Sequence, residues 1–186
     1  MTAARTASAA RRALSPTSVA RARPSAEIGA RGTRSSSFGS ANTKVWLRPR
    51  DFAEYIAQLA DDLYHSYKVS GDEIVLEVDV DVPPLPIDIA IPCGLLLNEL
   101  MSNCLKHAFR DASEGHIRVS LQREGVDAIA LTVADDGAGF PPDIDFRDTT
   151  SFGMQLVNTL VEQLAGVVEL KNDRGTVFTV TFPHDR

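Results

Sequence analysis

Cysteine, aromatic residues and long apolar stretches are all scarce in this chain. It has 186 residues and two cysteines, Cys93 and Cys104, which lie eleven positions apart and outside any paired metal-ligand spacing. Such a pair favours core thiols in a reducing compartment over a disulfide framework or a zinc site. Aromatic residues make up 6% of the chain, so we expect an aliphatic core. No apolar run approaches the roughly 20 residues that a membrane-spanning helix needs.

Acidic residues are nearly missing from the first 43 positions. This segment holds seven arginines and a single acid, Glu27, which gives it a formal charge of +6. Because the whole chain carries −6, residues 44–186 must carry −12. An acidic folded part argues against a nucleic-acid-binding surface, which needs a basic face.

The same segment is rich in Ala, Arg, Ser, Thr and Gly and has no apolar periodicity. We therefore predict a disordered tail over residues 1–43 and one folded domain over residues 44–186. The tail could be dispensable or lie upstream of a misassigned start, or it could be a basic arm for an acidic partner. Its arginine- and serine-rich, acid-poor composition also suits an organelle transit peptide. The expected location is the cytoplasm, or an organelle in that last case.

The rest of the chain switches between two periodicities. Apolar residues recur at three- and four-residue steps where helices are expected, and alternate with polar residues where half-buried strands are expected. Pro92 suits the first turn of the second helix, and Gly166 suits the end of the third. A tight turn at residues 173–175 predicts a final hairpin. The expected elements are helices at 50–67, 92–109 and 151–165 and strands at 73–82, 116–124, 128–134, 167–172 and 176–182.

Half-polar strands imply a sheet with one face in water, which leaves the other face for the helices to cover. The predicted fold class is therefore α/β (α+β). We expect a two-layer sandwich with a mixed, mostly antiparallel sheet and helices on one face.

The second helix carries an unusual set of polar side chains. At 100° per residue, Glu99, Asn103 and Lys106 lie within about 60° of one another. An Asn oxygen can ligate Mg²⁺, a Glu can orient or deprotonate a nucleophile, and a Lys can offer charge to a phosphate. This edge of the helix predicts phosphate chemistry, although a solvated face with a chance spacing would look the same. The stripe expected to face the sheet consists of Leu97, Leu100, Met101, Cys104, Leu105 and Ala108.

Three further motifs follow in order along the chain. Asp135 ends a strand, and Gly137 and Gly139 after it let the backbone approach a flat ring closely. Gly153 opens a helix whose free N–H groups could seat a phosphate. Thr176 enters the last strand and could line a pocket. Each motif also has an ordinary reading, as a turn, a helix start or a β-branched strand residue.

Taken together and in this order, the motifs resemble the GHKL superfamily of ATPases and kinases. The stretches "GLLLNELMSNCLKHAF", "VADDGAGFPPDIDF", "SFGMQLVNTLVEQLAG" and "GTVFTVTFP" are similar to the ATP-binding catalytic domain of a bacterial sensor histidine kinase. The likeness covers about residues 45–184.

This resemblance implies roles for the polar residues of the second helix. Asn103 would hold Mg²⁺, and Glu99 would help to activate the phosphate acceptor or a water. Lys106 and His107 would face the phosphates of ATP. Asp135 would accept a hydrogen bond from the adenine amine.

The remaining roles fall on the glycine motifs and the helix after them. Gly137 and Gly139 would pack against the adenine ring, and Thr176 would lie near it. Gly153 would open the helix beneath the phosphates after a flexible lid at residues 140–150. Leu156 in that helix belongs to the same implied nucleotide site.

No phenylalanine-rich box is evident between the Asp135 and Gly153 motifs, and the chain departs from the family pattern in three further respects. The third motif offers a single glycine, the lid is short, and none of the four histidines sits in a helix like the family's phosphoacceptor segment. These histidines are His65, His107, His116 and His184.

The implied activity is transfer of the γ-phosphoryl of ATP to a histidine on a partner or a missing dimerisation segment. The implied partners are a protein carrying that histidine, or a response regulator, and no nucleic acid. The alternatives are an anti-sigma-type serine kinase and a nucleotide-gated binding module.

Overall fold

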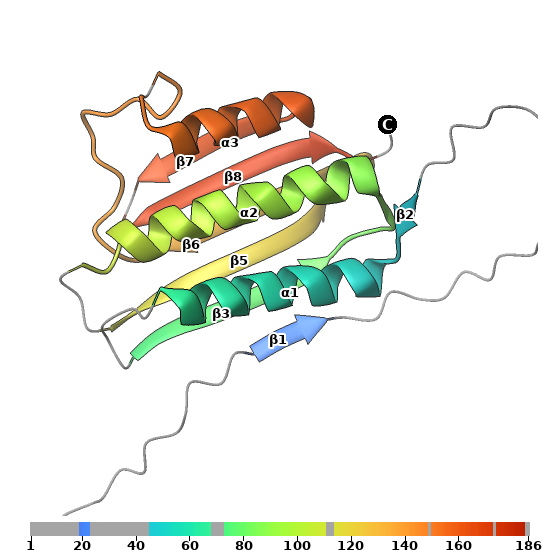
Figure 1. Ribbon diagram of the computed structural model, residues 1–186, viewed down its shortest axis with the longest axis horizontal. Coiled ribbons are helices and arrows are strands. Elements are labelled where there is room, and N and C mark those ends of the chain that lie inside the picture. Colours follow the sequence, from blue (N-terminus) through green and yellow to red (C-terminus); the bar gives the residue numbers. More distant parts are fainter. Residues whose placement is uncertain are drawn as a thin grey trace, which may run out of the picture.

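The computed structural model describes residues 19–22, 45–67, 73–110, 114–148, 150–172 and 174–184. In these residues, three helices cover one face of a six-stranded sheet (Figure 1). The predicted two-layer sandwich is therefore confirmed. The helices are α1 (Pro49–Ser66), α2 (Ile87–His107) and α3 (Phe152–Gln163), and the strands are β1 (Val19–Ala22), β2 (Trp46–Leu47), β3 (Glu73–Asp81), β4 (Leu85–Pro86), β5 (Glu114–Glu124), β6 (Ala128–Asp135), β7 (Val167–Asn172) and β8 (Thr176–Pro183).

The main sheet has the strand order β1-β3-β5-β6-β8-β7. Strand β3 runs parallel to both β1 and β5, while the pairs β5–β6, β6–β8 and β7–β8 are antiparallel. The expected mixed, mostly antiparallel sheet is confirmed. The short strands β2 and β4 form a separate antiparallel pair that the sequence did not predict.

The alternation read from the sequence decides which face of the sheet is buried. Every second residue of β3, β5, β6 and β8 lies in one core with the inner stripes of the helices, as predicted. On the opposite face, Arg118 of β5 pairs with Glu77 of β3 at 2.9 Å. The buried strand residues are Ile74, Leu76, Val78, Val80, Ile117, Val119, Leu121, Ile129, Leu131, Val133, Phe178, Val180 and Phe182, and the six predicted α2 residues are buried with them.

Helix α2 begins earlier than predicted. Its first residue is Ile87, so Pro92 is the sixth residue of the helix rather than part of its first turn. A proline inside a helix costs roughly 3 kcal/mol because it removes one backbone hydrogen bond and crowds the preceding turn. Burial of Ile89, Ala90 and Cys93 offsets this cost, since one buried Ile contributes about 1.5–3 kcal/mol.

The end of α3 also differs from the prediction in its detail. Ala165, rather than Gly166, adopts the left-handed conformation, with φ of 48°. The Gly166 N–H donates to the Val161 carbonyl at 2.9 Å, which completes a Schellman motif. Gly166 is needed for a different reason, because a β-carbon there would lie 2.7 Å from the Thr181 carbonyl oxygen of β8.

One short strand falls inside the segment predicted to be a disordered tail. Residues 19–22 form β1, which pairs in parallel register with residues 77–80 of β3 at the edge of the sheet (Figure 1). These four residues are the part of the predicted tail that the structure describes. The rest of that prediction lies outside the described residues.

Candidate functional site

A cavity of about 510 Å³ lies between the C-terminal half of α2, the end of β6, the loop that follows β6, and the start of β8. This volume falls in the range of about 300–1,000 Å³ that is typical of small-molecule sites. The lining residues are Leu100, Asn103, Cys104, His107, Ala108, Arg110, Val133, Asp135, Ala138, Gly139, Phe140, Pro141, Pro142, Ile144, Ser151, Met154, Thr176 and Phe178.

Asp135 is the carboxylate of this cavity. Its Oδ1 accepts hydrogen bonds from the backbone N–H groups of Gly137, at 3.0 Å, and Thr176, at 3.3 Å. The side chains of Cys104 and Thr176 also hydrogen-bond to it. Burial raises the pKa of Asp135 above its usual value, although these hydrogen bonds oppose the rise. The result is a largely buried acceptor whose position is fixed by the backbone around it.

Two glycines allow the chain to close around Asp135. Gly137 lies so near to the Ala108 carbonyl of α2 that a β-carbon would collide with it, and the next N–H, of Ala138, donates to that carbonyl at 2.9 Å. Gly175 has φ of +116°, and a β-carbon there would collide with the Asp135 carbonyl oxygen. Only glycine suits both the conformation and the space at position 175.

Asn103 and Cys104 contribute neighbouring groups from α2. The Asn103 amide nitrogen donates to the Met154 sulfur at 3.4 Å, and the Asn103 carbonyl oxygen accepts no hydrogen bond within the described part of the chain. Burial raises the pKa of Cys104 strongly, and the nearby Asp135 adds to the rise. The Cys104 thiol is therefore held protonated and donates to Asp135 instead of acting as a nucleophile.

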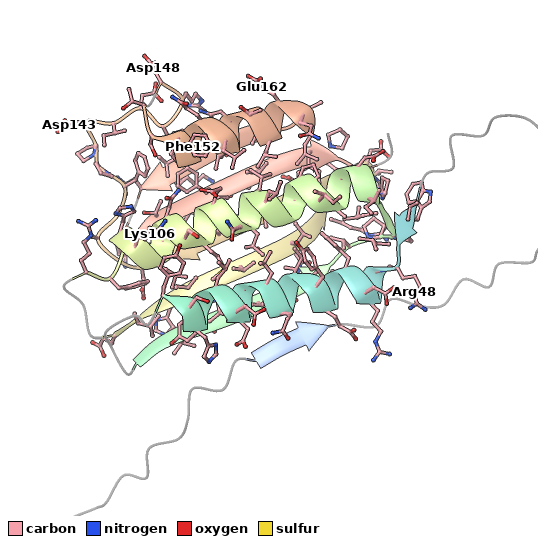
Figure 2. The ribbon with its side chains drawn as sticks, viewed as in Figure 1. Arg48, Lys106, Asp143, Asp148, Phe152 and Glu162 are labelled. Atoms are coloured by element: carbon pink, nitrogen blue, oxygen red, sulfur yellow. The ribbon has the colours of Figure 1, made fainter. Side chains whose placement is uncertain are left out.

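Three basic residues in different settings lie at the end of α2: Lys106 and His107 in its last turn, and Arg110 just after it. His107 and Arg110 line the cavity, whereas the Lys106 Nζ lies 5.4 Å from the centre of the Tyr67 ring. Figure 2 shows Lys106 at this end of α2, on the side of the molecule where the loop with Asp143 and Asp148 emerges. The sequence analysis missed Arg110. Its signal was a third basic residue, one helical turn after the predicted pair.

Glu99 lies beside the start of α3. A β-carbon on Gly153 would lie 2.9 Å from the Glu99 Oε2, so the carboxylate stands against the first turn of that helix. The N-terminal end of a helix carries partial positive charge, which favours a nearby carboxylate. Neither Glu99 nor Gly153 lines the cavity in this structure.

The loop predicted to be a lid is attached at two points. The Asn172 side chain of β7 bonds both the N–H and the carbonyl of Phe140, at 2.9 and 2.6 Å. Phe146 is buried edge-on against Phe178, with ring centres 5.7 Å apart, and its carbonyl accepts from Asn158 at 3.1 Å. Residues 141–145 run between these anchors, and three of them line the cavity.

The structure brings half of the predicted site residues into one cavity. Asn103, His107, Asp135, Gly139 and Thr176 line it, although they come from three separate stretches of the sequence. The other five predicted residues lie around it: Glu99 and Gly153 meet each other, Lys106 rests on Tyr67, Gly137 packs on Ala108, and Leu156 packs against the core.

A protein-family model matches residues 90–186, and its description reads histidine kinase-, DNA gyrase B-, and HSP90-like ATPase. Among curated proteins, Blue-light-activated histidine kinase 2 of Erythrobacter litoralis is 28% identical over 131 residues, which are 69% of this chain and 37% of that protein. Sensor histidine kinase PdtaS of Mycobacterium tuberculosis is 31% identical over 110 residues, 57% of this chain and 22% of that protein.

Solved structures of histidine kinases are also similar to this chain. The histidine kinase domain of the Erythrobacter litoralis EL346 blue-light-activated histidine kinase matches with a TM-score of 0.71 and 26% identity, covering 78% of this chain and 66% of that one. The catalytic domain of histidine kinase ThkA matches with a TM-score of 0.58 over 76% of this chain and 96% of that one. At 14% identity, this second likeness shows the fold alone. The resemblance read from the sequence is confirmed.

The chain spans 37% of the length of the first of these curated relatives and 22% of the length of the second. In the described part of the chain, no helix combines the length and the apolar character needed to cross a membrane.

Proposed function

The chain belongs to the histidine kinase-, DNA gyrase B-, and HSP90-like ATPase family, and on that premise we propose that its folded domain binds ATP with Mg²⁺ and transfers the γ-phosphoryl group to a histidine. The histidine would lie on a partner protein or on a segment outside the described residues. The curated relatives named above are a blue-light-activated histidine kinase and a sensor histidine kinase, which supports a place in two-component signalling. A cytoplasmic location, where ATP is available, is part of the same proposal.

The half-buried Asp135 carboxylate is the observation that carries this proposal. Both backbone hydrogen bonds to it go to Oδ1, and a carboxylate offers about four acceptor sites on its two oxygens, so Oδ2 can accept a hydrogen bond from a donor on a ligand. The exocyclic amine of adenine is such a donor, and the apolar wall formed by Leu100, Val133 and Met154 suits a flat ring. Guanine presents an oxygen at the same position, so we expect the site to select ATP over GTP.

The oxygen donors fit a Mg²⁺ ion that travels with the nucleotide. Mg²⁺ keeps several waters and usually takes one or two protein oxygens together with substrate phosphates. The Asn103 carbonyl oxygen supplies one, since it has no partner in the described part of the chain. No cluster of three or more His, Cys, Asp or Glu side chains that could hold a metal occurs among the described residues, which agrees with a phosphate-held ion. When bound, the ion would neutralise phosphate charge.

The protein's own share in phosphoryl transfer is positioning and charge. Lys106 and His107 would face the phosphates, and Lys106 must leave the Tyr67 ring to do so. Glu99 would orient or deprotonate the acceptor. Gly153 would let the phosphates approach the start of α3, where a larger side chain would collide with Glu99.

A nucleotide-gated binding module is the second candidate function. The positions of Lys106 on Tyr67 and of Glu99 against α3 favour it, because both groups stand outside the cavity. An anti-sigma-type serine kinase is the other alternative, and the chemical stability of the product separates it from a histidine kinase.

The test is to incubate the full chain with γ-labelled ATP and Mg²⁺ and to follow label on protein before and after acid. Acid-labile label would identify histidine transfer, and acid-stable label would identify a serine kinase. Tight binding without label, both alone and with a supplied histidine-bearing helical segment from a relative, would favour the binding module. Absence of ATP binding at millimolar concentration would overturn the proposal as a whole.

The role of Asn103 has its own readout. Asn103→Ala should weaken ATP binding in the presence of Mg²⁺ by about 5- to 50-fold, while binding in EDTA should change little. Calorimetric titration with and without Mg²⁺ measures both. Asn98→Ala, on the same helix and outside the cavity, is the matched control. Unchanged metal dependence in Asn103→Ala would remove Asn103 from its proposed role.

A further inference from the structure

Arg110 lies just after α2 and is not part of any of the motifs described above. Its guanidinium makes two defined contacts with the end of the helix. Nε donates to the Lys106 carbonyl oxygen at 3.1 Å, and an Nη group lies 3.0 Å from the His107 Nδ1. Arg110 and His107 also both line the cavity.

The contact with His107 fixes where the imidazole proton resides. A guanidinium has five donors and no acceptor, and it keeps its charge at every accessible pH. The His107 Nδ1 must therefore be the acceptor, which means that it carries no proton. The ring is then neutral, and its single proton lies on Nε2. His107 can offer a donor, but no positive charge, to a molecule in the cavity.

The surroundings of His107 favour the same state. Burial lowers its pKa, and the positive charges of Arg110 and then Lys106 lower it further. Among the residues that line the cavity from other elements, the only carboxylate is Asp135 of β6, in the described part of the chain. The loop residues that line it, Phe140, Pro141, Pro142 and Ile144, bear no charge. No acid contributes to the pKa of His107.

We propose that Arg110 is a positioning residue for the nucleotide, because it holds His107 as a neutral Nε2–H donor for the phosphate chain of ATP. This proposal rests on the proposed function, which supplies the nucleotide. The end of α2 is the basic part of the cavity, whereas Asp135 suits the amine of the base. Acceptor oxygens at the basic end belong to the phosphates.

One consequence is a site whose affinity does not depend on protonation of His107. A histidine with its ordinary pKa near 6.5 would gain charge as the pH falls and would bind phosphates more tightly. With Nδ1 occupied by Arg110, that gain is suppressed. Loss of Arg110 should therefore weaken binding above pH 7 and restore a pH dependence that the wild-type chain lacks.

The first experiment reads the tautomer directly, without nucleotide. In ¹⁵N-histidine spectra of the full chain, His107→Gln identifies the His107 signals. We expect the wild type to show the neutral Nε2–H form and to keep it to a lower pH than Arg110→Ala does. Arg110→Ala should show a mixture of tautomers and should become protonated at a higher pH than the wild type, although burial and Lys106 still lower the pKa of its His107. Arg123→Ala, an exposed arginine of β5 outside the cavity, is the matched control and should leave the spectrum unchanged.

The second experiment asks whether Arg110 acts through His107. At pH 7.5 with Mg²⁺, Arg110→Ala should raise the Kd for ATP about fivefold in the wild-type background and less than twofold in the His107→Gln background. ATP and Asp135 themselves titrate as the pH falls, so the ratio of variant to wild-type Kd is compared at each pH. This ratio should fall toward one as the pH falls and the His107 of the variant becomes protonated.

Two results would overturn the proposal. One is an equal loss in both backgrounds, which would mean that Arg110 contacts the nucleotide itself. The other is an unchanged His107 tautomer in Arg110→Ala. If the wild-type chain bound no ATP, the proposed function and the nucleotide half of this inference would both fall. The spectra would still decide the tautomer, so the two failures are distinguishable.

Discussion

The two ends of the cavity are built from different kinds of contact. The floor, formed by Asp135, Gly137, Gly175 and Thr176, is held by backbone hydrogen bonds and by glycines packed against carbonyl groups. The basic end, formed by His107 and Arg110 with Lys106 beside the cavity, is held by contacts between exposed side chains and one carbonyl. Contacts between exposed side chains are weaker than the backbone contacts of the floor, and Lys106 in particular is free to leave the Tyr67 ring. On the proposed function, the floor would be preformed for the base, while Lys106 would adjust to the phosphates.

The position of each end in the fold explains the difference. Asp135 ends β6, where it pairs with Ile117 of β5, and the residue before it, Ala134, pairs with Val177 of β8, so this part of the backbone is held by strands on both sides. Lys106 and His107 occupy the last turn of α2, where the final carbonyls lack helical partners. Arg110 satisfies one of those carbonyls from outside the helix.

The largest loss of stability should come from a substitution that fills the space between Gly175 and the Asp135 carbonyl. Gly175→Ala places a β-carbon against the Asp135 carbonyl at a strained φ of +116°, so we expect about 3 kcal/mol or more of lost stability. The matched change Gly125→Ala meets nothing within 4 Å at φ of +69°, and should cost about 1 kcal/mol. Urea unfolding of both variants measures the difference. Equal losses would contradict the description of a floor fixed by close packing.

The next largest effect is on ATP binding, which should respond differently to substitution of the neighbouring residues Asp135 and Asp136. Asp135→Asn should weaken ATP binding by about 10- to 150-fold, because it replaces a buried charged acceptor at the floor. Asp136→Asn should change ATP binding by less than about twofold. The Asp136 carboxylate turns away to His116, accepting from its N–H at 2.7 Å and contacting its Nδ1 at 3.0 Å. Fluorescent-nucleotide titration compares them, and similar losses in both variants would count against Asp135 as the base-reading group.

The same two aspartates should have opposite effects on stability as the pH changes. Burial raises the pKa of Asp135, so its contribution to stability is present below its unfolded pKa of about 3.9 and is lost as the pH rises through the folded value. For Asp136, burial opposes the shift but the hydrogen bonds from His116 lower the pKa. Its contribution is present above the unfolded pKa and is lost as the pH falls through the folded value.

At pH 7, Asp135→Asn should therefore leave the chain as stable as the wild type or more stable, while Asp136→Asn should be slightly less stable. Both differences should shrink toward pH 4. Thermal unfolding between pH 4 and pH 7 measures the direction of the stability change in each variant. A large destabilisation by Asp135→Asn at pH 7 would contradict the expected direction for Asp135.

The smallest effect on ATP binding should come from removing the contact between Lys106 and the Tyr67 ring. Tyr67→Leu removes the ring under the Lys106 ammonium and the hydroxyl that donates to Ser102 at 3.2 Å. An exposed cation–π contact is worth about 0.5–1 kcal/mol, so ATP should bind about two- to fivefold more tightly once Lys106 is released. Tyr55→Leu, in the helix α1 that Tyr67 follows, is the control and should not change binding. Weaker binding in Tyr67→Leu would mean that Tyr67 holds Lys106 ready for the phosphates.

Much of the site could be read from the sequence, because its motifs are local. Asp135 and the glycines after it follow a strand pattern that needs no tertiary information. Asn103 and Glu99 follow helical spacing, yet only Asn103 lines the cavity, since Glu99 meets Gly153 of another helix. The role of Arg110 depends on a contact with His107 that no periodicity reports. The start of α2 was misplaced because local proline preference gave way to burial of the residues around it.

By itself, the sequence determined the alternation that buries one face of the sheet, the stripes that place the helices on it, and the family to which the chain belongs. These follow from periodicity and from short motifs, which are properties of neighbouring residues. Only the tertiary structure decided that Asp135 is enclosed, that Gly166 and Gly175 are needed for close approach, and that Lys106 rests outside the cavity. Each of these depends on atoms from distant parts of the chain, whose distances are set by packing and not by spacing along the sequence.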